Sequence, residues 1–153
     1  MRRALTPIAS AAADLDQIAT AAASDIAPET LARIRELIDV TSDRSEIDPT
    51  WCVIGMLGGT GAGKSSLVNA LAGGEVVRAG VLRPTTNEPC AVLPRGRAPK
   101  ELLGWLGVNR RVDAPGDLAG ETAIIDLPDI DSVVASHGEV AGRLASRVDA
   151  LVV

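Results

Sequence analysis

The 153-residue sequence contains no phenylalanine and no tyrosine, and only two tryptophans, Trp51 and Trp105. A hydrophobic core therefore has to be built from Val, Ile, Leu and Ala, which are typical of sheets covered by helices. Hydrophobic residues make up 46% of the chain and charged residues 23%, values that suit a globular protein. The composition and length favour roughly one α/β domain.

The sequence also lacks an excess of basic residues. It has 15 Lys and Arg against 20 Asp and Glu, which gives a net charge of −5 and an isoelectric point near 4.8. Proteins that bind nucleic acids normally carry a basic surface. We therefore expect no nucleic-acid partner.

Cysteines and long apolar runs are also scarce. The two cysteines, Cys52 and Cys90, each lie in an apolar stretch, and two thiols do not form a disulfide framework. No apolar run reaches the roughly 18 residues of a membrane span. Asp14 and Asp16 interrupt the alanine-rich start before the apolar core of a signal peptide can form. We expect a cytoplasmic protein, and leave open membrane association through regions outside this chain.

Residues 1–46 predict two amphipathic helices. The first covers residues 5–24, and the second begins at Pro28, because proline is favoured at the first helical position. The apolar stripe expected on the first helix consists of Ile8, Ala11, Leu15, Ile18 and Ala22, and the stripe on the second of Leu31, Ile34, Leu37 and Ile38. Each apolar face needs a packing partner. The alternatives are the other helix, the following domain or a second copy of the chain in a homodimer. Residues 41–50 are polar, contain a proline and are expected to form a linker.

Four glycines fall within residues 58–63 and are followed directly by Lys64 and Ser65. Residues 51–57 predict a buried strand, and the residues after the glycines predict a helix that stops at Gly73 and Gly74. Gly-x-x-x-x-Gly-Lys-Ser between a strand and a helix is the phosphate-binding loop pattern. Glycine allows backbone N–H groups to approach a phosphate and adopts the left-handed turns of an anion-binding nest.

The rest of the chain predicts an alternation of strands and helices. Strands are expected at residues 90–94 and 121–128, and a further buried strand at residues 149–153. Residues 95–120 are expected to be irregular apart from a short helical run, and residues 129–148 to be a loop and a helix. Asp126 closes the apolar strand "TAIID". A carboxylate at the end of a strand next to a phosphate-binding loop is placed to bind Mg²⁺, usually through water.

Three segments together resemble a known family. "GGTGAGKSSLVNAL", "RPTTNEP" and "IIDLPD", in this order, look like the translation-factor class of P-loop GTPases, particularly the Era-like and bacterial dynamin-like branches. "DLPDIDS" is similar to a bacterial, notably actinobacterial, group of GTPases. The resemblance covers roughly residues 51–153. It implies a three-layer P-loop NTPase sheet with helices on both faces, in a domain spanning residues 47–153 after an N-terminal helical segment at residues 1–46.

The resemblance also implies roles for individual residues. A guanine nucleotide would be bound through its phosphates by Gly58, Gly59, Thr60, Gly61, Ala62, Gly63, Lys64, Ser65 and Ser66. Magnesium would be held by Ser65, Thr86 and Asp126, and the catalytic residues would be Lys64 and Thr86. Thr85 is the second choice for the threonine.

Two positions depart from the pattern of the family. Asp129 stands where the family has a glycine that faces the γ-phosphate, and Ile130 where it often has a water-orienting glutamine. We therefore predict slow hydrolysis, or a water placed by another group, a partner or a dimer.

The guanine-reading motif, N/T-K-x-D, does not occur in the sequence, so we expect an incomplete nucleotide domain. An ATP-using P-loop protein and a nucleotide-binding module with negligible hydrolysis remain alternatives.

Overall fold

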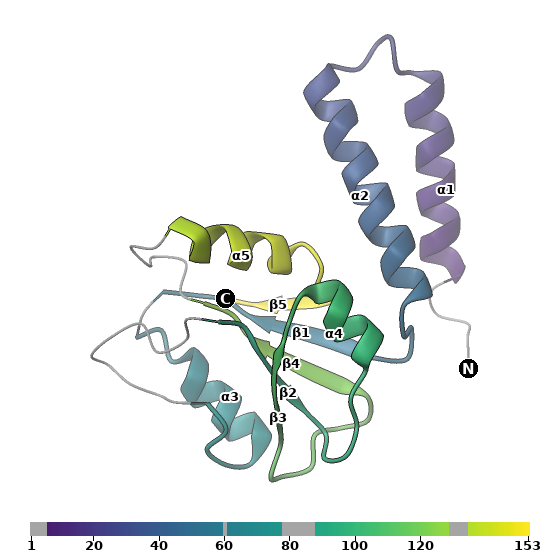
Figure 1. Cartoon of the computed structure of the whole chain (residues 1–153). Helices are drawn as coiled ribbons and strands as arrows, with labels where there is room; N and C mark the ends of the chain where they lie inside the picture. The colour runs from purple at the N-terminus through teal and green to yellow at the C-terminus, as the bar shows by residue number, and fades with distance from the viewer. Residues whose placement is uncertain (1–5, 60, 78–87, 129–134) are drawn as a thin grey trace. The chain divides into compact units, whose positions relative to one another are not determined.

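The computed structural model describes residues 6–59, 61–77, 88–128 and 135–153. The chain divides into two compact units, Met1–Thr50 and Trp51–Val153. The first unit contains two helices, α1 (Thr6–Ala21) and α2 (Pro28–Glu46), which pack against each other as a hairpin (Figure 1). The second unit contains the sheet and the remaining helices.

The helical hairpin is packed through small residues. Ala12 and Ala19, seven residues apart on α1, are buried, whereas Ile8 and Ile18 are 48% and 63% exposed. The predicted stripe on α1 is therefore wrong for Ile8, Ala11 and Ile18, which are exposed, whereas its members Leu15 and Ala22 are half-buried. Small side chains allow two helices to approach closely, and Leu31, Ile34 and Ile38 on α2 are half-buried. On α2, Leu37 is also exposed, by 58%.

The predicted linker at residues 41–50 is wrong over its first half, because α2 continues to Glu46. Thr41 Oγ1 donates a hydrogen bond to the Leu37 carbonyl at 2.7 Å, and Ser45 Oγ donates to the Ser42 carbonyl at 2.7 Å. Serine and threonine hydroxyl groups can donate hydrogen bonds to backbone carbonyl groups of the preceding helical turn. A polar composition therefore did not end the helix.

The second unit is built on a mixed five-stranded sheet, ordered β3-β2-β4-β1-β5 (Figure 1). Its strands are β1 (Cys52–Met56), β2 (Cys90–Leu93), β3 (Arg110–Asp113), β4 (Thr122–Asp126) and β5 (Ala150–Val152). β1 is parallel to both β4 and β5, whereas β2 is antiparallel to β4 and parallel to β3. The carboxyl ends of β1, β4 and β5 and the start of β2 therefore lie along the same edge of the sheet. This edge is the one formed by strand ends and not by an outer strand.

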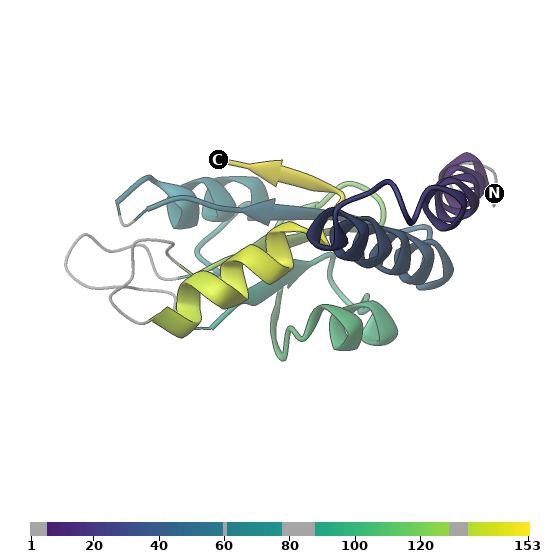
Figure 2. The ribbon, with the colours of Figure 1, turned by 90° about the horizontal axis from the view of Figure 1, so that it is seen from above.

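Helices cover both faces of this sheet, which confirms the predicted α/β fold class. α3 (Lys64–Ala72) lies on one face, and α4 (Lys100–Leu106) and α5 (Ala135–Ala145) lie on the other (Figures 1 and 2). Met56 on β1 packs in a cluster with residues of α3. The alternate residue Gly55 faces the opposite way, where an added Cβ would lie 3.2 Å from Val148, just after α5.

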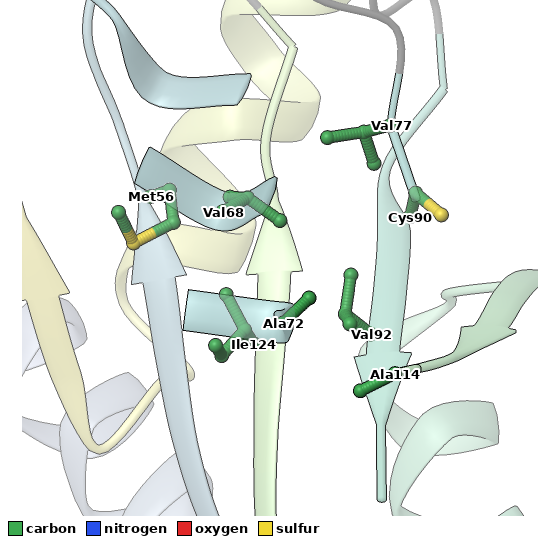
Figure 3. Packing of buried hydrophobic residues seen from close by; sticks show 8 residues of the cluster. All are labelled: Met56, Val68, Ala72, Val77, Cys90, Val92, Ala114 and Ile124. Atoms are coloured by element: carbon green, nitrogen blue, oxygen red, sulfur yellow. The ribbon is translucent and has the colours of Figure 1, made fainter. Parts of the chain in front are cut away.

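The core beneath α3 is aliphatic, as the composition predicts. Its buried members are Met56, Val68, Ala72, Val77, Cys90, Val92, Ala114 and Ile124 (Figure 3). They come from β1, β2 and β4, from the inner side of α3 and from the segments flanking these elements. This cluster joins the helix that follows the glycine loop to the strands on which that loop depends.

Residues 95–120 are more regular than the sequence predicted. They contain α4, where the short helical run was expected, and also β3, which was missed. β3 pairs in parallel with β2, from Cys90 opposite Arg110 to Leu93 opposite Asp113. It is an edge strand with exposed arginines. Charged residues are common on edge strands because they discourage further pairing, and they hide the strand from a search for apolar runs.

The last strand forms as predicted but is not buried. β5 pairs with β1 and lies at the other edge of the sheet, and Leu151 and Val152 are 39% and 41% exposed. An apolar run shows that a strand is favoured. It does not show whether the strand has neighbours on both sides, and β5 has a described neighbour on one side.

Candidate phosphate-binding site

The glycine-rich loop connects the centre of the sheet to α3. β1 ends at Met56 between β4 and β5, and the pairing continues for one more residue, because the Leu57 N–H donates to the Val152 carbonyl at 2.8 Å. α3 then begins at Lys64. In open α/β sheets, ligands bind outside the carboxyl ends of such strands.

The backbone of this loop requires glycine at specific positions. Gly61 and Gly63 have φ angles of +81° and +87°, in the left-handed region that side chains disfavour. Gly58 has a φ angle of +154°, which side chains also rarely adopt, and an added Cβ would lie 3.3 Å from the Ala62 Cβ. A side chain at Gly58 would therefore crowd the loop.

The first turn of α3 presents backbone donors. Its N-cap is Gly63, so no side chain caps the helix, and the first turn carries no acidic residue. The Leu67 N–H donates to the Gly63 carbonyl at 2.9 Å, whereas the N–H groups before it have no acceptor within the helix. These amides and the positive end of the helix dipole favour an anion at this point.

Lys64 is held over the loop. Its side chain is 9% exposed, and Nζ donates to the Gly58 carbonyl at 2.9 Å and to the Gly59 carbonyl at 3.1 Å. Burying an ammonium group is costly unless it is hydrogen-bonded. The chain therefore keeps a cation at the loop by means of the loop's own carbonyl groups.

Asp126 lies at the same edge of the sheet. It is the last residue of β4 and is 0% exposed. Its register partners are Met56 on β1 and Cys90 on β2. Ile124, two residues earlier, belongs to the cluster under α3 (Figure 3). Side chains alternate along a strand, so the Asp126 carboxylate lies on the face of the sheet that α3 covers.

Asp126 contributes to the pKa of a neighbouring residue, Cys90. Burial raises the pKa of the Cys90 thiol above its ordinary value of 9.0, Arg110 opposes the rise, and the Asp126 carboxylate adds to it. The Asp126 side chain thus lies fully buried near the end of β1. Asp and Glu are rarely fully buried unless they are paired or bind a metal.

The described part of the loop, residues 58–59 and 61–66, and Asp126 thus meet at one edge of the sheet. Thr60 and Thr86, like Thr85, Asp129 and Ile130, lie outside the described residues. Among the residues that are described, no three His, Cys, Asp or Glu side chains gather as a metal cluster. A divalent ion here would have to use a hydroxyl, a single carboxylate and ligand oxygens.

Asn69 was missed by the sequence reasoning. It lies within α3, and its side chain forms three hydrogen bonds to the backbone of Val76 and Val77. The available signal was an asparagine inside an apolar helix, where its side chain competes with helical hydrogen bonding.

No helix in the described part of the chain has the length and hydropathy needed to cross a bilayer.

No protein-family model and no curated protein matches this sequence. Among solved structures, the chain is similar to one from an oligomerised bacterial dynamin pair, a structure described as providing a mechanism for long-range sensing and tethering of membranes. The TM-score is 0.46 and the identity 16%, and the match covers 97% of this chain. This chain spans 28% of the length of that protein.

Proposed function

We propose that the protein is a Mg²⁺-dependent GTP-binding protein that hydrolyses GTP slowly. The observation that carries this proposal is the meeting of three features at one edge of the sheet. They are a glycine loop with an uncapped helix N-terminus, the buried Lys64 and the buried Asp126. Each of these features would bind a different part of a magnesium-bound polyphosphate.

The loop and Lys64 would bind the phosphates. Amides at the start of α3 would donate to phosphate oxygens, as in other helix N-terminal phosphate sites. The Lys64 ammonium, which donates to the Gly58 and Gly59 carbonyls, would turn to the β- and γ-phosphates. An ammonium is a compact point charge with three donors, so it can exchange carbonyl partners for phosphate oxygens.

Magnesium fits the donors at this edge. The ion prefers oxygen ligands and is often bound through one or two carboxylates, waters and substrate phosphates. Ser65, which begins the first turn of α3 with Lys64, would supply a hydroxyl, and Asp126 a carboxylate acting through water. Thr86 would complete the set. When bound, the ion would neutralise charge on the β- and γ-phosphates.

The choice of guanine and the slow rate rest on the sequence. The combination of the phosphate loop, "RPTTNEP" and "DLPD" is the basis for GTP, while ATP remains the alternative. At residues 129 and 130, an aspartate and an isoleucine replace groups that face the γ-phosphate and orient water. The chain would thus bind and position GTP well but accelerate its hydrolysis little.

Calorimetric titration of the full chain with GTP, GDP, ATP and ADP in Mg²⁺ tests this function. Lys64→Ala should weaken binding of the triphosphate by about 100-fold, the effect of losing a charge-assisted contact. The chain has only one other lysine, Lys100, at the start of α4, so Lys100→Ala is a matched control that should leave affinity unchanged. Equal binding by Lys64→Ala and wild type would contradict the proposal.

Hydrolysis is measured separately as phosphate release. We expect a rate of about 10⁻³ per second or slower for wild type, close to unassisted GTPases, and a lower rate for Lys64→Ala. If the two rates were equal, the protein would be a nucleotide-binding module without catalysis. Tighter binding of ADP than of GDP would favour the ATP-using alternative.

A further inference from the structure

The α/β unit contains a cavity of about 400 Å³ next to the outer strands β2 and β3. Residues of two segments line it, the turn at 94–97 that follows β2 and the loop at 114–120 that follows β3. We call it the β2–β3 cavity. Ligand pockets commonly measure about 300–1,000 Å³, so this volume suits a small organic molecule better than a single ion.

The direction of the strands places the β2–β3 cavity at the edge of the sheet opposite the phosphate loop. β2 runs antiparallel to β4, and β3 is parallel to β2. The carboxyl ends of β2 and β3 therefore lie together, at the other edge from those of β1, β4 and β5. In open α/β sheets, ligands bind outside the carboxyl ends of the strands. This mixed sheet has two such places, one for each strand direction.

The chain leaves the ends of β2 and β3 toward opposite faces of the sheet. After β2 it enters α4, which lies on the face that α5 also covers (Figures 1 and 2). After β3 it reaches the end of α3 on the other face, where the Gly116 N–H donates to the Ala72 carbonyl at 2.8 Å. Connections that separate in this way leave a crevice between them, which is the usual place for a ligand.

Both walls of the cavity are held by the backbone. The turn after β2 is closed by the Arg97 N–H, which donates to the Pro94 carbonyl at 3.1 Å, and Gly96 within it has a φ angle of +73°. The other wall packs directly on α3, because an added Cβ at Gly116 would lie 2.9 Å from the Ala72 carbonyl oxygen. A ligand would therefore enter a site that is largely formed beforehand.

Two arginines, Arg95 and Arg97, line the cavity. Arg97 Nη1 lies 3.5 Å from Glu121 Oε1, and the two side chains are 55% and 40% exposed. Such an exposed ion pair is weak, so a ligand can replace it. Within the described part of the chain, the Arg95 side chain has no hydrogen-bond or ion-pair partner. A guanidinium group presents a fork of donors that matches a carboxylate or a phosphate.

The rest of the lining is mostly apolar. Pro94, Ala114 and Leu118 form part of it, and apolar walls suit the carbon skeleton of a ligand. Asp117, an exposed residue, places one negative charge in the same lining. An anionic group in the cavity would thus be attracted by two positive charges and repelled by one.

We propose that the β2–β3 cavity is a second binding site, which takes a small organic anion carrying a phosphate or a carboxylate group. Arg95 and Arg97 would bind the anionic group, and the apolar wall would contact the rest of the molecule. The site goes beyond the proposed function and does not depend on it, because its residues lie at the opposite edge of the sheet from the phosphate loop.

An amide NMR titration of the full chain with glucose 6-phosphate and with citrate tests the site and separates the two anionic groups. At least one probe should shift the amides of Gly96, Gly116 and Gly120 with an affinity of about 1 mM, as a few charged contacts provide, whereas uncharged glucose should not. A response to one probe alone supports the proposal and identifies the preferred group. No shift of these amides by either probe at about 10 mM, or an equal response to glucose, would overturn it.

Substitutions test the roles of the charged side chains. Arg95→Gln and Arg97→Gln should each weaken binding about tenfold, the effect of losing a hydrogen bond to a charged group. Asp117→Asn removes the repelling charge and should tighten binding by about twofold to fivefold. Arg111→Gln, at an exposed position of β3 outside the lining, is the matched control and should bind as wild type does.

Two results with these variants would overturn the proposal. One is unchanged affinity in both Arg95→Gln and Arg97→Gln. The other is equal weakening in Arg111→Gln, which would show attraction to the general surface charge. A wild type that bound GTP but neither probe would overturn this inference and leave the proposed function intact, whereas binding of a probe without binding of GTP would have the opposite meaning.

Discussion

The helical hairpin and the α/β unit differ in the side chains that they bury. In the described part of the hairpin, the buried hydrophobic residues are two alanines, Ala12 and Ala19, and three large apolar residues stay exposed. The α/β unit buries a large set of aliphatic side chains and also two charged residues, Lys64 and Asp126. Both units expose some large apolar residues, but among the described residues only the α/β unit buries charged ones.

The difference marks the place in the fold where we expect a functional site. Removing a charged group from water is costly, so a fold that buries a lysine and an aspartate at one edge gains something there besides stability. Strongly desolvated ionisable groups in one place mark candidate functional sites. Among the described residues of the hairpin, no charged residue is buried to this degree. Because the hairpin buries few side chains, we expect it to contribute less to the stability of the chain.

Core truncation should give the largest difference between the two units. Leu106→Ala, at a position 0% exposed in α4, should lower the free energy of unfolding by about 2–5 kcal/mol, because it leaves a cavity. Leu37→Ala, at a position 58% exposed in α2, should change it by less than about 0.5 kcal/mol. Denaturant unfolding followed by circular dichroism reports both units, and similar losses in the two variants would contradict the comparison.

The tryptophans sharpen this measurement. Trp51 and Trp105 both lie in the second unit, so their fluorescence follows the α/β unit alone. We expect Leu106→Ala to shift the fluorescence transition and Leu37→Ala to leave it in place.

Neutralising the buried carboxylate should affect binding next most strongly. Asp126→Asn keeps the shape of the side chain but removes its charge, so the Mg²⁺-dependent gain in GTP affinity should fall by about tenfold to 100-fold. The control is Asp117→Asn in an exposed loop, which should keep the full gain. Titrations with Mg²⁺ and with a chelator measure the effect. An undiminished response to Mg²⁺ in Asp126→Asn would remove Asp126 from the metal site.

The two cysteines should give the smallest effect. Because burial raises the pKa of Cys90 above 9.0, the folded chain keeps a proton there that the unfolded chain loses. Stability should therefore fall as the pH rises through about 9 and beyond. Cys90→Ala should reduce this fall, whereas Cys52→Ala, at an exposed position, should not. The free energy of unfolding, measured between pH 8 and about 10.5, checks this prediction. Identical pH dependence in wild type and Cys90→Ala would contradict a contribution of the Cys90 thiol.

The sequence predicted the parts of the α/β unit that rest on local rules. A β-rich apolar run, four glycines and a helix ending in Gly-Gly correctly gave β1, the loop and α3, and "CAVLP" and "TAIID" gave β2 and β4. Each of these signals is short in range. It depends on backbone conformation and on an apolar pattern that a single segment already contains.

The misses depend on neighbours that are distant in the sequence. β3 carries exposed arginines because it is an edge strand, and β5 is exposed for the related reason that its other side has no described strand. On α1, the choice of Ala12 and Ala19 over Ile8 and Ile18 depends on how closely α2 approaches. Asn69 forms its side-chain hydrogen bonds only when the chain folds back at Val76 and Val77.

The most direct test of the account is an amide NMR titration of the full chain with Mg²⁺ and GTP. The account predicts that the largest shifts occur at the backbone amides of Gly61 and of residues 63–66, with little change in α1 and α2. Binding that shifted only the amides of the hairpin, or that left the amides of residues 63–66 unmoved, would contradict the claim that this loop and helix end hold the phosphates.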